Sequence, residues 1–167
     1  MAKKLFTRKE GWCWLFGVID HFNSEVIGST MVKHGDRFEA AMAIQQSILN
    51  RYGTLGINCS RGLEMRCDLG SQYTSAYCKN TMEHYGIQIS YSWARSPECN
   101  GIIERFFRTL EEQVFSVNDF ETIAEAIDAG QEFIKRYNEE WMIERLGYKS
   151  PHEALQEYYD TSIKSAC

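Results

Sequence analysis

The chain has 167 residues, 44% of them apolar, and a net charge of −5, which fits one globular domain with a real core. No apolar run reaches the roughly 20 residues of a membrane span, and no leader precedes a cleavage site, so we expect a cytoplasmic protein without membrane contact. The negative charge argues against broad DNA contact, but it allows a small basic groove or a basic domain elsewhere in a longer parent chain.

The six cysteines form no CxxC pair and no zinc-type spacing with histidine. We therefore expect buried or free thiols in a reducing compartment, and no disulfide framework. The four histidines are scattered along the chain, so the sequence offers no histidine-rich metal site.

The first third of the chain predicts three antiparallel strands. Residues 1–10 are basic and begin abruptly, with no cap or turn before residues 5–7, as if cut from a longer protein. Residues 12–19 are apolar on both faces, which favours a central strand. After a turn at 20–24, residues 25–32 are expected to return beside it.

Helices and strands then alternate. Asp36 is placed to cap a helix over residues 37–52, which Gly53 ends. Residues 62–67 predict a strand that ends at Asp68. The apolar stripe of the helix is expected to contain Phe38, Met42, Ile44, Ile48 and Leu49.

The rest of the chain adds one strand and several helices. A helix over 75–85 precedes a strand over 87–91, and Pro97 marks a loop into a helix over 99–115. Further helices are expected over 120–141 and, because a proline suits a first turn, over 151–159. The tail after this last helix should fray.

This order of elements predicts an α/β fold. An antiparallel start with parallel strands added through helices gives a mixed five-stranded sheet flanked by helices, of the ribonuclease-H-like type. The domain is expected to span residues 1–159, with residues 160–167 as the frayed tail.

Two acids stand out in this pattern. Asp68 ends a strand at the edge where ligands collect in such sheets, and Gly70 allows close approach by a substrate. Glu104 lies one turn into the helix over 99–115, with 35 residues between the acids. Together they would suit Mg²⁺ or Mn²⁺, and two ions about 3.5–4 Å apart would stabilise a phosphodiester displacement. Spacing alone also allows a plainer role, in which Asp68 caps a turn and Glu104 supports a helix N-terminus.

The segments around both acids resemble a known family. Residues 68–75 read DLGSQYTS, and residues 100–110 read NGIIERFFRTL. They are similar to the D-x-G-S-Q-Y-T-S and N-x-x-x-E-x-F-F-[KR]-T-L motifs in the integrase catalytic core of DDE transposases and retroviral integrases, especially the bacterial insertion-sequence type. Residues 137–138 (YN) and 146–151 (LGYKSP) match further motifs, so the resemblance covers most of residues 5–159.

The resemblance implies DNA integration and transposition by metal-dependent phosphodiester cleavage and strand transfer. Asp68 and Glu104 would then be catalytic ligands of Mg²⁺ or Mn²⁺. The implied partners are transposon ends, target DNA and further copies of the chain, as a homodimer or higher multimer.

The third acid of the family is missing from its expected place. The family has it on the strand before residues 12–19, which puts the position at Met1 or Ala2, and neither side chain binds a metal. Asp20 also follows an apolar strand, but it corresponds to a turn-capping acid. We expect a chain cut or altered at its first catalytic acid and weak or no strand transfer, with Asp20 as a replacement acid the alternative.

Four residues near the acids are candidate DNA contacts. Arg108 lies on the helical face of Glu104, where the family has a basic residue. Asn100, Gln72 and Tyr73 flank the acids, although a helix start and a packed aromatic ring also explain them. Four other rings are expected in the core and not as a base-stacking surface: Trp12, Trp14, Phe106 and Phe107.

Two other classes of function were compared with this hypothesis. A catalytically silent module of the same fold, for dimerisation or nucleic-acid binding, is the main alternative. A nuclease for RNA–DNA hybrids is disfavoured because the motif around Glu104 is of the transposase type. The acidic segment over 139–145 stands where the family has basic residues, which weakens any DNA role there.

Overall fold

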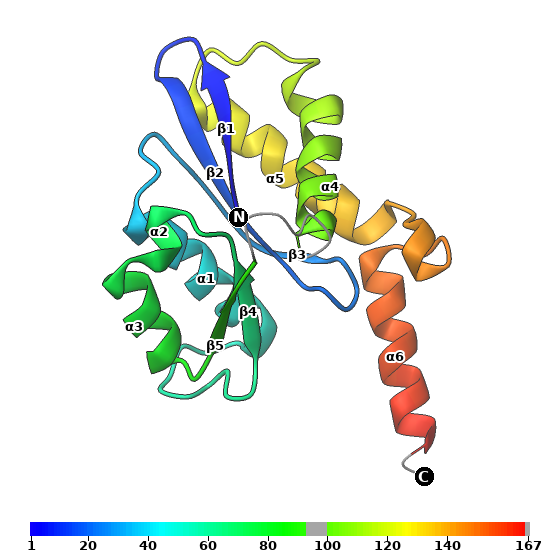
Figure 1. Cartoon of the computed structure of the whole chain (residues 1–167). Helices are drawn as coiled ribbons and strands as arrows, with labels where there is room; N and C mark the ends of the chain where they lie inside the picture. The colour runs from blue at the N-terminus through cyan, green and yellow to red at the C-terminus, as the bar shows by residue number, and fades with distance from the viewer. Residues whose placement is uncertain (93–99, 166–167) are drawn as a thin grey trace.

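The computed structural model describes residues 1–92 and 100–165 (Figure 1). The predicted loop at Pro97 and the predicted helix start at residue 99 lie outside these residues. The elements, in chain order, are β1 Ala2–Thr7, β2 Gly11–Ile19, β3 Val26–Val32, α1 Arg37–Tyr52, β4 Glu64–Cys67, α2 Ser71–Thr74, α3 Ala76–His84, β5 Gln88–Tyr91, α4 Gly101–Leu110, the π-helical turn η2 Glu111–Phe115, α5 Ile123–Glu140, the 3₁₀ turn η3 Glu144–Leu146 and α6 Pro151–Ser165.

The first three strands pair antiparallel and the last two pair in parallel, as their order predicts. β2 lies between β1 and β3 and pairs antiparallel with both, so the prediction of a central strand is confirmed. β4 and β5 pair in parallel, with Cys67 opposite Tyr91, and α2 and α3 make the connection between them.

The single five-stranded sheet that we predicted is not found in the described part of the chain. Its strands form a three-stranded sheet, β1-β2-β3, and a separate two-stranded sheet, β4-β5. Hydrophobic patterns identify strands but not which edges bond, and here β4 bonds only to β5. Among residues 1–92 and 100–165, β1 pairs with β2 and with no other strand, so the two sheets remain separate.

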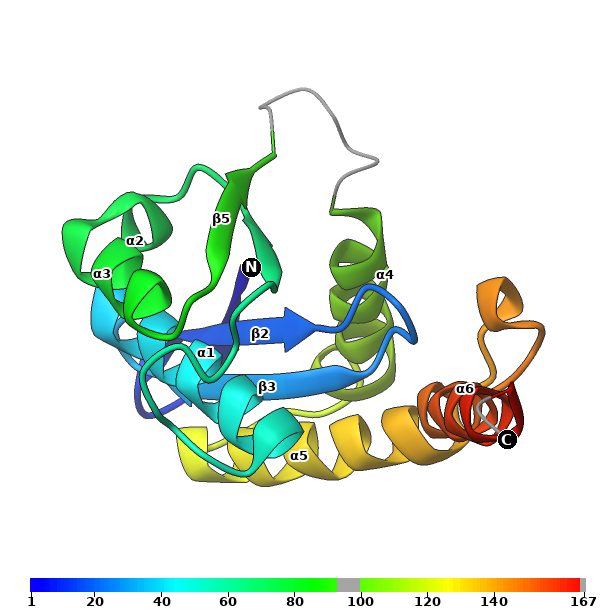
Figure 2. The same ribbon diagram turned by 90° about the horizontal axis from the view of Figure 1, so that it is seen from below.

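Helices cover both faces of the three-stranded sheet (Figure 2). On one face, Leu5 and Leu15 pack with residues of α4 and α5, including Phe106 and Phe107, both predicted core residues. On the other face, Phe16 packs with α1, α3 and the end of β4. Gly17 lets α4 approach closely, because a Cβ there would lie 3.1 Å from the Phe107 ring.

Helix α1 has the bounds that we predicted, but its buried face differs from the predicted apolar stripe. Asp36 caps it by accepting from Phe38 N at 2.7 Å, and Gly53 ends it in the left-handed region. Its buried face consists mainly of small residues. These let it pack closely on β3, where a Cβ at Gly28 would lie only 2.4 Å from the carbonyl oxygen of Ala43. Ile44 and Ile48 are buried as predicted, but three predicted members of the stripe are exposed: Phe38, Met42 and Leu49.

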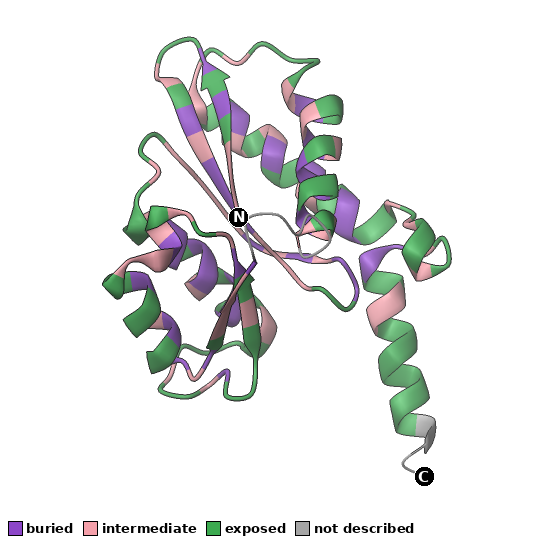
Figure 3. Ribbon diagram, viewed as in Figure 1, coloured by how far each residue is buried: buried purple, intermediate pink, exposed green. Residues whose placement is uncertain are grey.

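The C-terminal helices differ from prediction mainly at their ends. α6 continues to Ser165, so the helix does not end at residue 159 as predicted. Figure 3 shows that most of α6 is exposed. No helix in residues 1–92 or 100–165 is long and apolar enough to cross a membrane.

Candidate catalytic site

Asp68 follows β4 directly and is held by the next turn. Its Oδ1 accepts a hydrogen bond from Gly70 N at 2.8 Å, which confirms the turn-capping role that spacing allowed. A Cβ at Gly70 would lie 2.7 Å from the same oxygen and 2.8 Å from Nε2 of Gln72. Any other residue at position 70 would therefore require the carboxylate of Asp68 and the amide of Gln72 to shift.

Glu104 lies in the first turn of α4, where its amide donates to the carbonyl of Asn100 at 3.0 Å. Its side chain is exposed and borders a hollow of about 360 Å³, together with Ala2, Lys3 and Arg108. Lys3 is already engaged there, since its Nζ lies 3.1 Å from Glu111. Glu104 and Arg108 share this hollow without forming an ion pair in the described structure.

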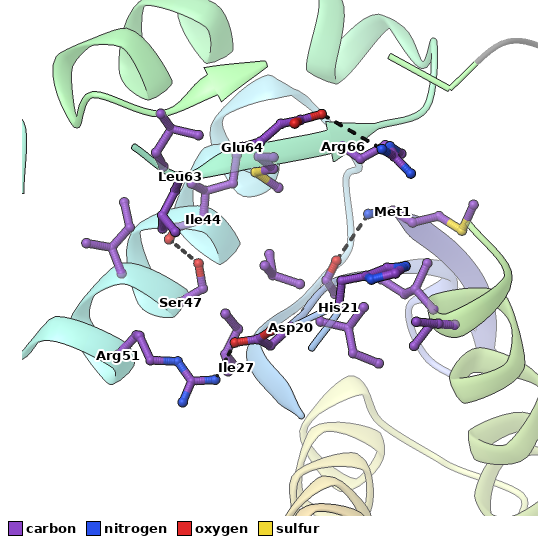
Figure 4. A pocket seen from close by; sticks show the side chains of 18 of the residues that line it. Met1, Asp20, His21, Ile27, Ile44, Ser47, Arg51, Leu63, Glu64 and Arg66 are labelled. Atoms are coloured by element: carbon purple, nitrogen blue, oxygen red, sulfur yellow. Dashed lines mark hydrogen bonds and ion pairs between the residues drawn. The ribbon is translucent and has the colours of Figure 1, made fainter. Parts of the chain in front are cut away.

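Asp68 borders a second, larger cavity of about 510 Å³ between the two sheets. Figure 4 looks into this cavity, which Ile27, Ile44 and Leu63 line with apolar side chains. Asp20 and Arg51 border it with charged groups.

Met1 and Ala2 each border a hollow that also holds one of the two acids. Met1 lines the larger cavity with Asp68, and Ala2 lines the smaller hollow with Glu104. The Met1 amino group donates to the carbonyl of Gly17 at 3.1 Å, and burial lowers the pKa of this amine although the nearby Asp68 charge opposes the shift. The predicted position of the third acid therefore shares one hollow with Asp68 and the other with Glu104.

Asp20 serves the turn-capping role that we preferred for it. Its Oδ1 accepts from Phe22 N at 2.9 Å, and its Oδ2 accepts from Arg51 at 2.8 Å. Arg51 also bonds Glu25 at 2.9 Å. This ion-pair network fastens the β2–β3 turn to α1.

The flanking candidates fall into different environments. Asn100 is half-buried and donates to Oγ of Ser92 at 2.9 Å, and Ser92 in turn donates to the carbonyl of Cys67 at 3.2 Å. Gln72 is half-buried beside Gly70. The link through Ser92 was missed, because nothing in the sequence connects residues so far apart.

Tyr73 is a core residue, which corrects its candidacy as a DNA contact. Its side chain is only 2% exposed, and its ring packs edge-on against Phe16 at 6.4 Å. Burial raises the pKa of its hydroxyl. The packed-aromatic role that the sequence also allowed is the one observed.

Trp12 was predicted to be a core residue, and this is wrong because its side chain is 64% exposed. It lies near the β1–β2 turn, opposite Phe6 in the ladder. The sequence predicted a strand that is apolar on both faces, but it did not show which of its rings would be left exposed.

The residues described contain no group of three or more His, Cys, Asp or Glu side chains placed to hold one metal ion. Four of the six cysteines are described, and all four are free, as expected: Cys13, Cys59, Cys67 and Cys78.

Solved structures show which class of fold this is. The catalytic core domain of BIV integrase matches 97% of this chain and 95% of its own, with a TM-score of 0.65 and 19% identity. The HTLV-2 integrase catalytic core domain in complex with magnesium matches 92% of this chain and 91% of its own, with a TM-score of 0.66 and 15% identity. The fold is that of integrase catalytic cores.

Sequence comparisons then give the family. A model of the TnsB C-terminal domain matches residues 4–119, and a model of the integrase core domain matches residues 85–158. The transposase for insertion sequence element IS904 of Lactococcus lactis is 32% identical over 87% of this chain and 55% of its own length. The putative transposase InsK for IS150 of Escherichia coli is 29% identical over 87% of this chain and 50% of its own length.

The chain therefore belongs to the integrase-core family of insertion-sequence transposases, which confirms the resemblance found in its motifs. It spans about half the length of these curated relatives.

Proposed function

We propose that the chain is the catalytic core, over residues 1–159, of a transposase that cleaves and joins DNA with the help of divalent metal ions. The main support for this proposal is that the two acids of the family motif border adjoining hollows. Met1 shares one hollow with Asp68, and Ala2, the next residue, shares the other with Glu104.

The donors present suit Mg²⁺ or Mn²⁺. Oδ2 of Asp68 and both carboxylate oxygens of Glu104 accept no hydrogen bond from the described residues, so they are free to bind a cation. Carboxylate oxygens are the ligands that these ions prefer. Bound ions would supply positive charge to the oxygens of a phosphodiester.

DNA is the proposed substrate, as transposon ends and target. Arg108 is exposed beside Glu104, and Asn100 lines the cavity of Asp68, so both remain proposed DNA contacts, with Gln72 beside them. The HTLV-2 integrase core is known in dimeric and trimeric forms, and we propose a homodimer or higher multimer for this chain. Light scattering of the purified protein measures that state.

Weak or absent strand transfer is the expected activity of this chain. Neither Met1 nor Ala2 has a side-chain carboxylate, and Asp20 is bound to Arg51. Incubation with Mg²⁺ and labelled DNA carrying the element's ends tests this expectation. Robust cleavage or joining would show that the third ligand is supplied by another residue.

Calorimetric titration with Mn²⁺ tests the metal site. We expect specific uptake that is lost in Asp68→Asn and Glu104→Gln, because each change removes a charged ligand. Glu112→Gln is the matched control, since Glu112 borders the same hollow as Glu104 outside the family motif. Equal titrations for all four proteins would favour the catalytically silent module instead.

A further inference from the structure

The open face of the β1–β2 hairpin has a group of exposed aromatic rings. Side chains alternate along both strands, so Leu5, Thr7 and Cys13 point into the core. The opposite face holds Lys4, Phe6, Trp12 and Trp14, which we name the aromatic platform. Lys4 lies opposite Trp14 in the ladder, and Phe6 lies opposite Trp12.

The platform presents large apolar surfaces to solvent. Phe6 is 56% exposed and Trp12 is 64% exposed, and their rings meet edge-to-face with centroids 5.6 Å apart. Trp14 is half-buried and leads to the buried ring of Phe16, with the two rings stacked at 6.5 Å and 18°. Trp14, on the same face as the exposed rings, is therefore anchored to the core.

Positive charge accompanies these rings. Residues 1–14 contain four basic side chains and one acid, although the whole chain has a net charge of −5. Lys3 and Arg8 are paired with Glu111 and Asp119, so Lys4 is the cation that belongs to the platform. The ammonium group of Lys4 lies 4.7 Å from the centre of the Trp14 ring and has no carboxylate within 4 Å in the described structure. Exposed rings with an unpaired cation beside them suit a partner that has both aromatic faces and negative charge.

Unpaired DNA bases meet both requirements. Each base has a π-face that stacks on an aromatic ring, and each nucleotide brings a phosphate for the basic side chains. Duplex DNA offers only base edges and phosphates, because its base faces are already stacked. A symmetric contact between two copies would place the basic hairpins against each other, which like charges oppose.

We propose that the aromatic platform binds single-stranded DNA by base stacking, with Lys4 contacting its backbone. This goes beyond the proposed function, because the platform needs no metal. Phe6 lies about 16 Å along the strand from Met1, at about 3.3 Å per residue, so the platform is a surface separate from the two acids.

Fluorescence anisotropy of a labelled oligothymidine, in EDTA and low salt, tests the proposal without involving the metal site. Trp12→Ala is expected to weaken binding about tenfold or more, and Phe6→Leu, which keeps the apolar bulk without the ring, also weakens it. Lys4→Gln should reduce the slope of log K against log salt by about 0.7. Circular dichroism confirms that each variant is folded.

Phe22→Ala is the matched control. Phe22 and Tyr158 form another exposed edge-to-face pair, 53% and 52% exposed with centroids 5.0 Å apart, away from the basic hairpin. This variant should bind DNA as the wild type does. Equal loss in Phe22→Ala and Trp12→Ala, or no binding by the wild type in low salt, would overturn the proposal. An oligomer that only Trp12→Ala dissociates, with DNA binding unchanged, would identify the platform as a protein interface instead.

Discussion

Gly70 shows how one residue sets the position of a candidate ligand. The Asp68 carboxylate occupies the space where any other residue at position 70 would place its Cβ, only 2.7 Å from Oδ1. The backbone of Gly70 is at φ −58°, which every residue can adopt, so the requirement for glycine is one of space and not of conformation.

Gly70→Ala is therefore expected to weaken Mn²⁺ binding although it removes no ligand. The added methyl group must displace the carboxylate of Asp68 or the amide of Gln72. Calorimetry measures this loss, and Gly56→Ala is the control because nothing lies within 4 Å of a Cβ there. Unchanged affinity in Gly70→Ala would show that the site tolerates a shifted carboxylate.

The buried thiols of Cys67 and Cys78 should lower the free energy of unfolding at alkaline pH. Burial raises the pKa of Cys67 to about 12 and that of Cys78 to about 11. The unfolded chain releases these protons near pH 9, while the folded protein retains them. Stability is therefore complete below about pH 9 and falls above it, by about 1.4 kcal/mol per pH unit for each thiol.

Urea unfolding at pH 7 and pH 10 measures this effect. Cys67→Ala should show a smaller loss between the two pH values than the wild type, because the cavity it leaves costs the same at both. Cys59→Ala, at a half-buried position in a loop, provides the comparison. Identical losses in all three proteins would contradict a role for Cys67.

At the scale of the element, helix α5 is fastened to the edge of β3 by one side chain. Oδ1 of Asn138 accepts from Val26 N at 2.9 Å, and its Nδ2 donates to the carbonyl of Val26 at 3.0 Å. All these groups are buried, so the amide takes the place of a neighbouring strand. This gives a structural role to an asparagine that the sequence indicated only through a family motif.

Asn138→Ala should lower the free energy of unfolding by about 1–3 kcal/mol, because it leaves two buried backbone groups unpaired. Asn50→Ala is the matched control. Asn50 also donates to the β3 backbone, at 2.9 Å to Ile27, but from an exposed position, so its loss should cost about 0.5 kcal/mol or less. Chemical denaturation of both variants makes the comparison.

The elements were largely predictable because local chemistry determines them. Asp36 and Gly53 mark the ends of α1, and the apolar residues of β2 mark a central strand. The predictions that were wrong concern features that depend on distant parts of the chain. These features are the exposure of Trp12, the small buried face of α1 and the division of the sheet. At the site, the motif around Asp68 and Glu104 gave the family, but only the structure shows Tyr73 buried and Ser92 linking Asn100 to Cys67.

At the scale of the whole molecule, the cavity between the sheets separates two open strand edges. β1 pairs with β2 as far as Met1 and Gly17, so Val18 and Ile19 line the cavity with no strand on that side among the described residues. On the other side, Glu64 of β4 lines it as well. A continuous five-stranded sheet is therefore a proposal that requires one more paired segment in this space.

A short strand-forming extension fused ahead of Met1 should raise the melting temperature. Each kcal/mol gained corresponds to about 2–4 °C for a protein of this size. The same extension with prolines is the control, since proline cannot donate backbone hydrogen bonds. Equal melting temperatures would show that the cavity does not accept a strand.

Strand β1 also has a consequence for how this protein tolerates mutation. Leu5 and Thr7 are buried, whereas Lys4 and Phe6, which alternate with them along the strand, are exposed. If randomised variants are selected only for folded, soluble protein, positions 5 and 7 should stay restricted while positions 4 and 6 accept most residues. Selection for DNA binding should restrict positions 4 and 6 as well, so the two screens together would separate what the strand needs to fold from what it needs to act.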